Sequence, residues 1–569
     1  MKFLIKKIYI ILFLLILVQP RVFAKDNKIL YTSKNVSNYF LGIVSAQNDH
    51  NEKAYKYLNK VRSLNNSHSK FNIEFIRTLI LLEKMDKAYA FSKSIWDENE
   101  LFFEADLLLG LDSLKKKDYK NSEKYFERLN KVSRYNIFFE NFVGNILIAW
   151  SKASEGKQEE SFSYLEKIPK PYHHFKKIQE VFLKCYFDHQ DTQNFFQEII
   201  KNKNYNFSRY NFFLANYLLF NEKDETALKI IQNARKENSS NLLIKETENY
   251  LINGKKEKIK DFFDCKNPND SIAEFFYVIA NLHSSEQNYK LSNFYFQISN
   301  HLNKKFLTNK ALMAENLYYK KKYKLSKNIY ESLKPIGPIY FWYASKSIAK
   351  ILLKEKGKEY SIRNLEKEFN LISNPTFENY YELANFYKDY EYYKKSIKYY
   401  SLALEEINYD HFLVSKILDR RGTSYERLGD WENAEKDLME SLNILPDQPH
   451  VMNYLAYSWI DKGINLDKGL EMLIQANKMR EEDGYIIDSV GWAYYAKKNY
   501  VEAEKFLRRA VQLIPADPII NDHYGDVLWM LNKNIQARYI WGNILTLEPS
   551  EELRDQLSKK LIFGIKNKL

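Results

Sequence analysis

The chain has 569 residues and a formal net charge of +13, and 45% of its residues are hydrophobic. Only 16 Gly and 12 Pro are present, which leaves little material for tight turns and argues against a β-rich fold. The length exceeds that of one ordinary domain, but a stack of repeats can grow without needing a larger central core.

The N-terminus has the pattern of a secretory signal peptide. Lys2, Lys6 and Lys7 precede an apolar run at residues 8–18, and a small-x-small cleavage site ends at Ala24. We therefore expect residues 1–24 to be a signal peptide cleaved after Ala24, with an uncleaved anchor as the alternative. Cysteine is missing near this site, so a bacterial lipid anchor is not expected. Export also makes nucleic acid an unexpected partner.

A small residue recurs through the rest of the chain, mostly at intervals of 34 or 35 residues, with larger residues four and seven places later. This spacing is typical of the second helix of a helical hairpin that packs on its neighbours. Residues 31–170 are expected to form four hairpins, and a degenerate copy is expected at residues 251–263. The small residues are Ala54, Ala88, Ser122, Ser161, Thr192, Ala227, Ser292, Ser326, Ser361, Ser396, Ala434, Gly469, Ala503 and Ala537.

The two cysteines, Cys185 and Cys265, lie 80 residues apart. In a linear stack this places them about two repeats from each other, beyond the roughly 7 Å between Cα atoms that a disulfide permits. We expect both cysteines to be free and mostly buried.

Catalytic and metal-binding motifs are not expected to operate here. The nearest approach to a metal cluster is His173, His174, Cys185 and His189, but His174 and Cys185 are about 16 Å apart along a continuous helix. The sequence has neither a His-Glu-x-x-His pair nor a glycine-rich phosphate loop. We therefore expect no metal, no cofactor and no enzyme activity.

The repeat is written most clearly at residues 484–549, where Gly491, Ala503 and Pro515 recur 34 positions later. This segment resembles the tetratricopeptide repeat (TPR) family, and the resemblance covers nearly the whole chain after residue 24. It implies an all-α fold, an α-solenoid with a right-handed superhelix of about fifteen helix-turn-helix repeats. The residues expected to pack the repeats together are Gly422, Ala434, Gly491, Ala503, Gly525 and Ala537.

The expected domains follow from this pattern. Residues 25–345 are diverged, basic TPR-like repeats, residues 346–550 are TPR repeats with the best matches at 422–549, and residues 551–569 are a C-terminal capping helix or tail. Residues 410–569 carry 21 Lys and Arg against 25 Asp and Glu, so the back of the chain is acidic and the front is basic.

In the TPR family the first helix of each hairpin lines a concave groove, and the second, fifth, ninth and twelfth places point into it. A ladder of short polar groups beside aromatic rings suits an extended peptide. The acids in it favour a basic or neutral ligand, whereas some relatives clamp a carboxylate with Lys and Asn. The alternative is that the Trp residues only pack the stack. In this chain the residues that the resemblance places at these groove positions are Asn453, Tyr457, Asp488, Trp492, Tyr495, Asp522, Asp526 and Trp529.

We therefore expect a non-catalytic periplasmic scaffold or adaptor that binds protein or peptide partners in this groove, in cell-envelope assembly or proteolysis. The C-terminal motifs resemble those of exported proteobacterial repeat proteins, among them lipoprotein adaptors of a carboxyl-terminal processing protease. An alternative is a protein or enzyme accessory that binds an envelope polysaccharide such as peptidoglycan. A lesser alternative is contact of the basic front with an anionic membrane surface. The partner and the oligomeric state stay open.

Overall fold

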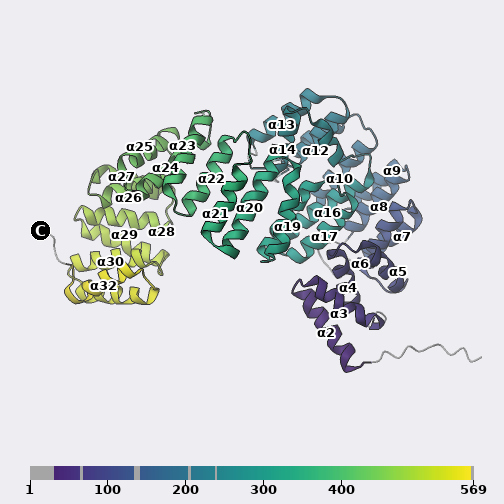
Figure 1. The fold of residues 1–569 in the computed structure, drawn as a ribbon, viewed down its shortest axis with the longest axis horizontal. Coiled ribbons are helices and arrows are strands. Elements are labelled where there is room, and N and C mark those ends of the chain that lie inside the picture. The colour runs from purple at the N-terminus through teal and green to yellow at the C-terminus, as the bar shows by residue number, and fades with distance from the viewer. Residues whose placement is uncertain are drawn as a thin grey trace, which may run out of the picture. The chain divides into compact units, whose positions relative to one another are not determined.

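The computed structural model describes residues 31–64, 68–132, 141–202, 207–237, 240–409 and 411–565, and these residues contain helices and no strand. These residues form thirty-one α-helices, α2 to α32, most of which pair with a neighbour in sequence as a helix–turn–helix repeat (Figure 1). This confirms the expected all-α repeat solenoid. The expected signal peptide and its cleavage site at Ala24 lie outside the described residues. Among those described, no helix is both long and apolar enough to cross a membrane.

Residues up to Glu355 form a first compact unit, called unit 1 below. Its first eight helices make the four hairpins expected at residues 31–170, and α14 and α15 make the degenerate hairpin expected near residues 251–263. The helices are α2 (Ser33–Gln47), α3 (Asn51–Leu58), α4 (Ser69–Leu81), α5 (Met85–Ile95), α6 (Phe103–Lys115), α7 (Tyr119–Val132), α8 (Val143–Ser154), α9 (Gln158–Glu166), α10 (His173–Tyr186), α11 (Thr192–Ile200), α12 (Tyr210–Phe220), α13 (Asp224–Glu237), α14 (Leu242–Ile252), α15 (Lys256–Phe262), α16 (Pro268–Ser285), α17 (Tyr289–Leu302), α18 (Lys310–Tyr319), α19 (Tyr323–Leu333) and α20 (Pro338–Lys356).

Residues from Lys356 onward form a second compact unit, unit 2. The boundary lies ten residues after the domain limit expected at residue 345. The helices of unit 2 are α21 (Lys358–Phe369), α22 (Phe377–Asp389), α23 (Tyr393–Glu406), α24 (Leu413–Arg427), α25 (Trp431–Ile444), α26 (Pro449–Asp461), α27 (Leu466–Met479), α28 (Gly484–Ala496), α29 (Tyr500–Leu513), α30 (Pro518–Met530), α31 (Asn534–Ile544) and α32 (Glu551–Phe563).

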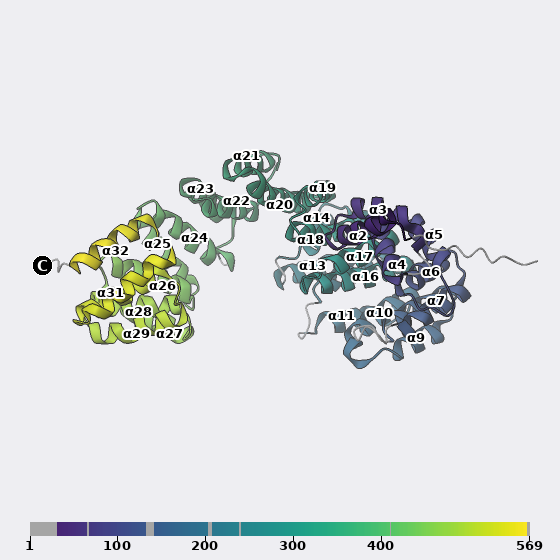
Figure 2. The same ribbon diagram turned by 90° about the horizontal axis from the view of Figure 1, so that it is seen from below.

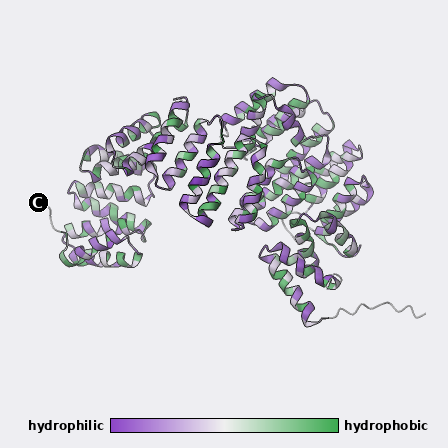
Figure 3. Cartoon of the chain, in the orientation of Figure 1, coloured by the Kyte–Doolittle hydropathy of each residue, from purple (hydrophilic) through white to green (hydrophobic). Residues whose placement is uncertain are grey.

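The small residues of the repeat pattern all lie in the second helices and are buried. They are small because the first helix of the same hairpin crosses there. The opposing glycines show the same limit: a Cβ on Gly491 would lie 2.6 Å from Cγ of Leu507, and one on Gly525 would lie 2.3 Å from Nε1 of Trp541. Hydrophobic and polar residues accordingly alternate along most helices (Figure 3).

Unit 1 winds back on itself around the hairpin of α16 and α17. Helix α17 contacts α4 (Figure 2), and α16 contacts both α8 and α10. Residues 292–299 of α17 are all buried, as expected for a helix enclosed on every side. Lys290 forms an ion pair with Glu74 at 2.9 Å across this junction. Helices more than two hundred residues apart in sequence therefore share one core.

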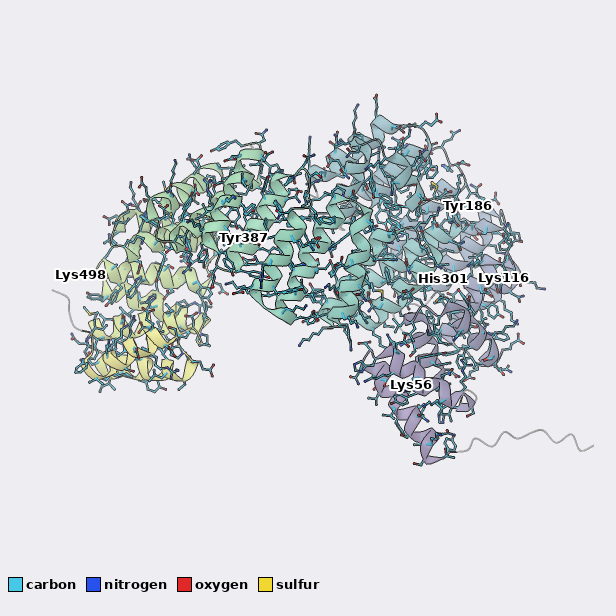
Figure 4. The ribbon with its side chains drawn as sticks, in the orientation of Figure 1. Lys56, Lys116, Tyr186, His301, Tyr387 and Lys498 are labelled. Atoms are coloured by element: carbon cyan, nitrogen blue, oxygen red, sulfur yellow. A yellow bond between two sulfur atoms is a disulfide. The ribbon has the colours of Figure 1, made fainter. Side chains whose placement is uncertain are left out.

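The winding corrects the expectation that the cysteines are free. Cys185 and Cys265 form a disulfide with 6.0 Å between their Cα atoms. Cys185 lies near the end of α10, beside Tyr186 (Figure 4), and Cys265 lies just before α16. Because α16 packs directly on α10, the two cysteines meet although repeats separate them along the chain. Lys266 strengthens this contact by donating to the carbonyl oxygen of Tyr186 at 2.9 Å.

Candidate partner-binding site

The first helices of the last repeats position the expected groove residues. Helix α28 begins at Gly484 because the Asp483 carboxylate accepts the backbone N–H of Tyr485 at 3.1 Å and that of Ile486 at 3.4 Å. Asp517 caps α30 in the same way, and Lys498, with φ of 62°, forms the turn after α28 (Figure 4). These boundaries set the phase of each helix, so residues spaced by three and four share one face.

Trp492 is the centre of an aromatic stack in this face. Its ring lies parallel to that of Tyr495, with 4.6 Å between centroids, and to that of His523 in the next repeat, at 4.0 Å. The ring is partly buried. Two of the expected groove residues, Trp492 and Tyr495, are thus brought together, and they are joined by a histidine that the sequence analysis missed.

His523 is paired with Asp488. Its Nδ1 atom lies 3.0 Å from both carboxylate oxygens of Asp488, and both side chains are buried. Burial alone lowers the pKa of His523, but the charge and hydrogen bond of Asp488 outweigh it, and the net pKa is raised. The pair therefore favours a protonated imidazole stacked on an indole ring, which is a cation–π arrangement.

Asp522 and Asp526 are paired with Lys560 from α32. The Lys560 Nζ atom lies 2.8 Å from Asp522 Oδ1 and 2.6 Å from Asp526 Oδ1. Burial and the charge of Asp522 raise the pKa of Asp526 to about 6, against the opposing effect of Lys560. Trp541 also donates its Nε1–H to Asp526 at 3.2 Å. The basic group that meets these two acids is therefore part of the same chain.

Trp529 is covered by the end of the chain. Its ring lies 5.6 Å from that of Trp541 between centroids, and Arg538 lies over it at 5.0 Å. A Cβ on Gly564 would lie only 1.9 Å from Cζ2 of Trp529, so the backbone after α32 passes directly against the indole. Trp529 acts as packing for α32 and the residues after it.

Asn453 and Tyr457 on α26 differ from the other expected groove residues. The Asn453 side-chain oxygen is buried without a hydrogen-bond partner in the described part of the chain. Burial and the nearby charges of Asp488 and Asp461 raise the pKa of Tyr457 to about 12. In the two following repeats the second place of the first helix presents Tyr485 and Ile519, which are 56% and 49% exposed. Groups able to receive a ligand therefore lie on α26, α28 and the start of α30.

The repeat period in the sequence can predict one of the missed partners, Lys560. Lys560 lies 34 residues after Asp526, which is one period, so extending the repeat into the capping helix places a cation in the ninth place of that helix. His523 occupies the sixth place, which is not among the groove positions of the family, and nothing in the pattern singled it out.

In unit 1, His173 and His174 help to line a cavity of about 180 Å³ between α10 and α11. Cys185, which was considered with them as a metal ligand, is held in the disulfide. Across the described ranges, three His, Cys, Asp or Glu side chains nowhere gather in a way that could hold a metal ion.

Comparison with known proteins found one family model, the tetratricopeptide repeat, which matches residues 489–517. A TPR repeat-containing protein of Pseudomonas aeruginosa is 31% identical over 110 residues, which are 19% of this chain and 18% of that protein. The chain therefore matches less than a fifth of that relative's length.

Solved structures of repeat proteins are similar at low sequence identity. The APC/C hetero-tetramer Cut9–Hcn1 aligns with 83% of this chain and 98% of its own, at 13% identity and a TM-score of 0.36. YrrB, a TPR protein with an unusual peptide-binding site, aligns with 30% of this chain and 86% of its own, at 19% identity and a TM-score of 0.25.

The matched repeat comprises most of α28 and α29, and its buried small residue recurs at the same place in hairpins on both sides. The chain therefore contains, at residues 489–517, a segment that matches the tetratricopeptide repeat, within an all-α repeat solenoid.

Proposed function

We propose that the chain is a non-catalytic scaffold of the cell envelope that binds a protein or peptide partner along the first helices of unit 2. The observation that carries the proposal is the side-chain oxygen of Asn453, which is buried without a partner. An unpaired buried acceptor costs about 1–3 kcal/mol, and a peptide N–H that meets this oxygen once the Asn453 side chain turns outward would recover this free energy.

The surroundings of Asn453 indicate the character of the ligand. Asp488, Asp522 and Asp526 are already paired with His523 and Lys560, so the acids no longer argue for a basic ligand. The exposed side chains nearby, Tyr485 and Ile519, are large and apolar. A neutral, extended peptide whose apolar side chains contact these two residues fits the arrangement.

The disulfide supports a place outside the cytoplasm. Disulfides persist in oxidising compartments such as the bacterial periplasm and are rare in the cytosol. Cys185 and Cys265 are both buried, and their Cα atoms are 6.0 Å apart, within the usual range for a disulfide. This agrees with the signal-peptide pattern of residues 1–24.

The polysaccharide alternative is less well supported. Sugar rings bind to the open face of an aromatic side chain, but Tyr495 and His523 stack against the Trp492 ring. Trp529 is likewise packed against Trp541 and the backbone at Gly564. Contact of the basic front of the chain with an anionic membrane stays a lesser proposal, which predicts binding that weakens steeply with salt.

The test is an affinity capture from a cell-envelope extract with the full chain, followed by calorimetry with the captured protein. Asn453→Ala should weaken binding by about tenfold while leaving stability unchanged or slightly higher, because it removes an unpaired buried oxygen. Asn477→Ala is the matched control: its oxygen is also buried and unpaired, but it lies on α27, a second helix. Equal binding by Asn453→Ala and the parent would show that the groove assignment is wrong.

A further inference from the structure

A second candidate site lies on the other layer of unit 2. A groove of about 750 Å³ runs between the second helices α25 and α27, above α26. Its apolar lining is Met439, Leu442, Pro446, Met452, Trp459 and Met472. The lower part of this lining continues into the core, because Leu442 and Met472 pack against buried residues of the hairpins on both sides. Met439, at the edge of the groove, is 47% exposed.

The matching seam between α29 and α31 also holds a groove, of about 510 Å³, but charged side chains line it. There Glu504, which follows the small residue Ala503, accepts from Lys533 at 2.6 Å and also pairs with Arg508. Lys533 is the residue just before α31. These three charged side chains bridge the two second helices.

The bridge is missing between α25 and α27. Glu435 follows the small residue Ala434, as Glu504 follows Ala503, but the residue just before α27 is the uncharged Asn465. Glu435 accepts instead from Trp459 Nε1 at 2.6 Å, inside the groove. In the described part of the chain this seam therefore lacks such an ion pair, and Met439 is an exposed part of its apolar lining.

The charges at the rim are also unused. Glu432, Lys436, Lys468 and Glu471 line the groove and take part in no ion pair among the residues that the structure describes. Together with Glu435 they leave the rim with three acids and two bases. An apolar channel with an excess of acid at its rim is complementary to a ligand that is apolar on one side and basic at its edges.

We propose that this groove binds an amphipathic helix of a partner protein. Its apolar face would lie on Met439 and Met472, whose flexible side chains adapt to differently shaped partners. Its Lys or Arg side chains would lie against Glu432 and Glu471. This site is independent of the concave face that carries Asn453, so one chain could hold two partners at once.

The proposal is tested with a fluorescein-labelled synthetic helix of about 18 residues, five turns long, with Leu along one face and Lys on both flanks. Fluorescence anisotropy is measured with the full chain. Met439→Glu should weaken binding by about tenfold or more, because it places a charge on the apolar lining. Met479→Glu is the matched control, because Met479 is also on an outer helix and 39% exposed but does not line the groove. It should change binding by less than about twofold.

Two further arms make the test decisive. Met439→Leu should restore binding, and a probe with Glu in place of Lys on its flanks should bind about fivefold more weakly or worse. Equal binding by Met439→Glu and Met479→Glu would overturn the proposal. Loss of binding in Asn453→Ala would also overturn it, since the probe would then occupy the concave face. A dimer of the parent that Met439→Glu dissociates would show that a second copy, not a partner helix, covers the groove.

Discussion

Units 1 and 2 are built from the same repeat but are held together by contacts of different range. In unit 1, Lys290 pairs with Glu74, 216 residues away in sequence. In unit 2, Lys533 pairs with Glu504, 29 residues away and in the neighbouring repeat. One hydrophobic cluster of unit 1 extends from Ile43 to Leu352, whereas the described clusters of unit 2 are small and lie at successive seams.

The difference decides how each unit should unfold. A stack whose repeats contact only their neighbours behaves as a one-dimensional array and can open from its ends. A stack that winds back on itself loses distant contacts together, so it should unfold as one cooperative body. Unit 2 is of the first kind and unit 1 of the second.

The largest effect is expected from Glu274→Ala in unit 1. Glu274 is fully buried and accepts two hydrogen bonds from Arg209, at 2.8 Å each, while Arg209 also donates to Asn309 at 2.7 Å. Removing the carboxylate leaves a largely buried cation without its partner, which costs about 3–5 kcal/mol. Urea unfolding, with hydrogen exchange as the readout, should show this loss of unfolding free energy across the whole of unit 1.

Asp261→Ala is the control for this prediction. Its pair with Lys305 is exposed, with 61% and 68% of the two side chains accessible, so its loss should leave the stability of unit 1 nearly unchanged. If Glu274→Ala weakened only α12 and α16 and left the rest of unit 1 protected, unit 1 would not be one cooperative body.

The disulfide is expected to have the next largest effect. It closes a loop across a sequence separation of 80 residues, and replacing both Cys185 and Cys265 by Ser should cost about 2–4 kcal/mol. The loss should be confined to unit 1, and a reductant should reproduce it in the parent chain. Two reactive thiols in the purified, unfolded and unreduced protein would show instead that the bond does not form.

The hairpins could be predicted from the sequence, but the path of the stack could not. A small residue is favoured wherever two helices of a hairpin cross, so residues such as Ala54 and Ala537 mark the repeats from one end to the other, except in the degenerate hairpin of α14 and α15. The path depends on small rotations between repeats, which add up over several hairpins and leave no mark on any one residue. For this reason the meeting of Cys185 and Cys265 was missed.

The same limit applies to the candidate site. The places of Asp488, Trp492 and Asp526 on first helices followed from the period. Their partners did not, because a pair such as Asp488 with His523 depends on the side-chain register between two repeats. The 34-residue period can predict Lys560, since it lies one period after Asp526. This requires that α32 is counted as the first helix of a further repeat and not only as a cap.

The smallest effect concerns pH and the last repeats of unit 2. The pKa of Asp526 is about 6 in the folded chain, above its ordinary value of 3.8, so the folded state holds this proton more tightly than the unfolded state does. The unfolding free energy of α30 to α32 should therefore fall as the pH rises from about 4 to 6, by about 2 kcal/mol at most. His523, whose pKa is also raised, stabilises the fold below about pH 6.5 and loses this contribution as the pH rises through its folded pKa.

Asp526→Asn should abolish the decrease in unfolding free energy that Asp526 causes between about pH 4 and 6. Asp555→Asn, which changes an exposed carboxylate on α32, should leave it in place. Hydrogen exchange resolved by segment distinguishes the two units, because the Asp526 contribution should appear in α30 to α32 and fade within the next repeats. An effect of equal size on α22 and α24 would mean that unit 2 unfolds as a whole. The contrast with unit 1 would then lie in the range of the contacts and not in cooperativity.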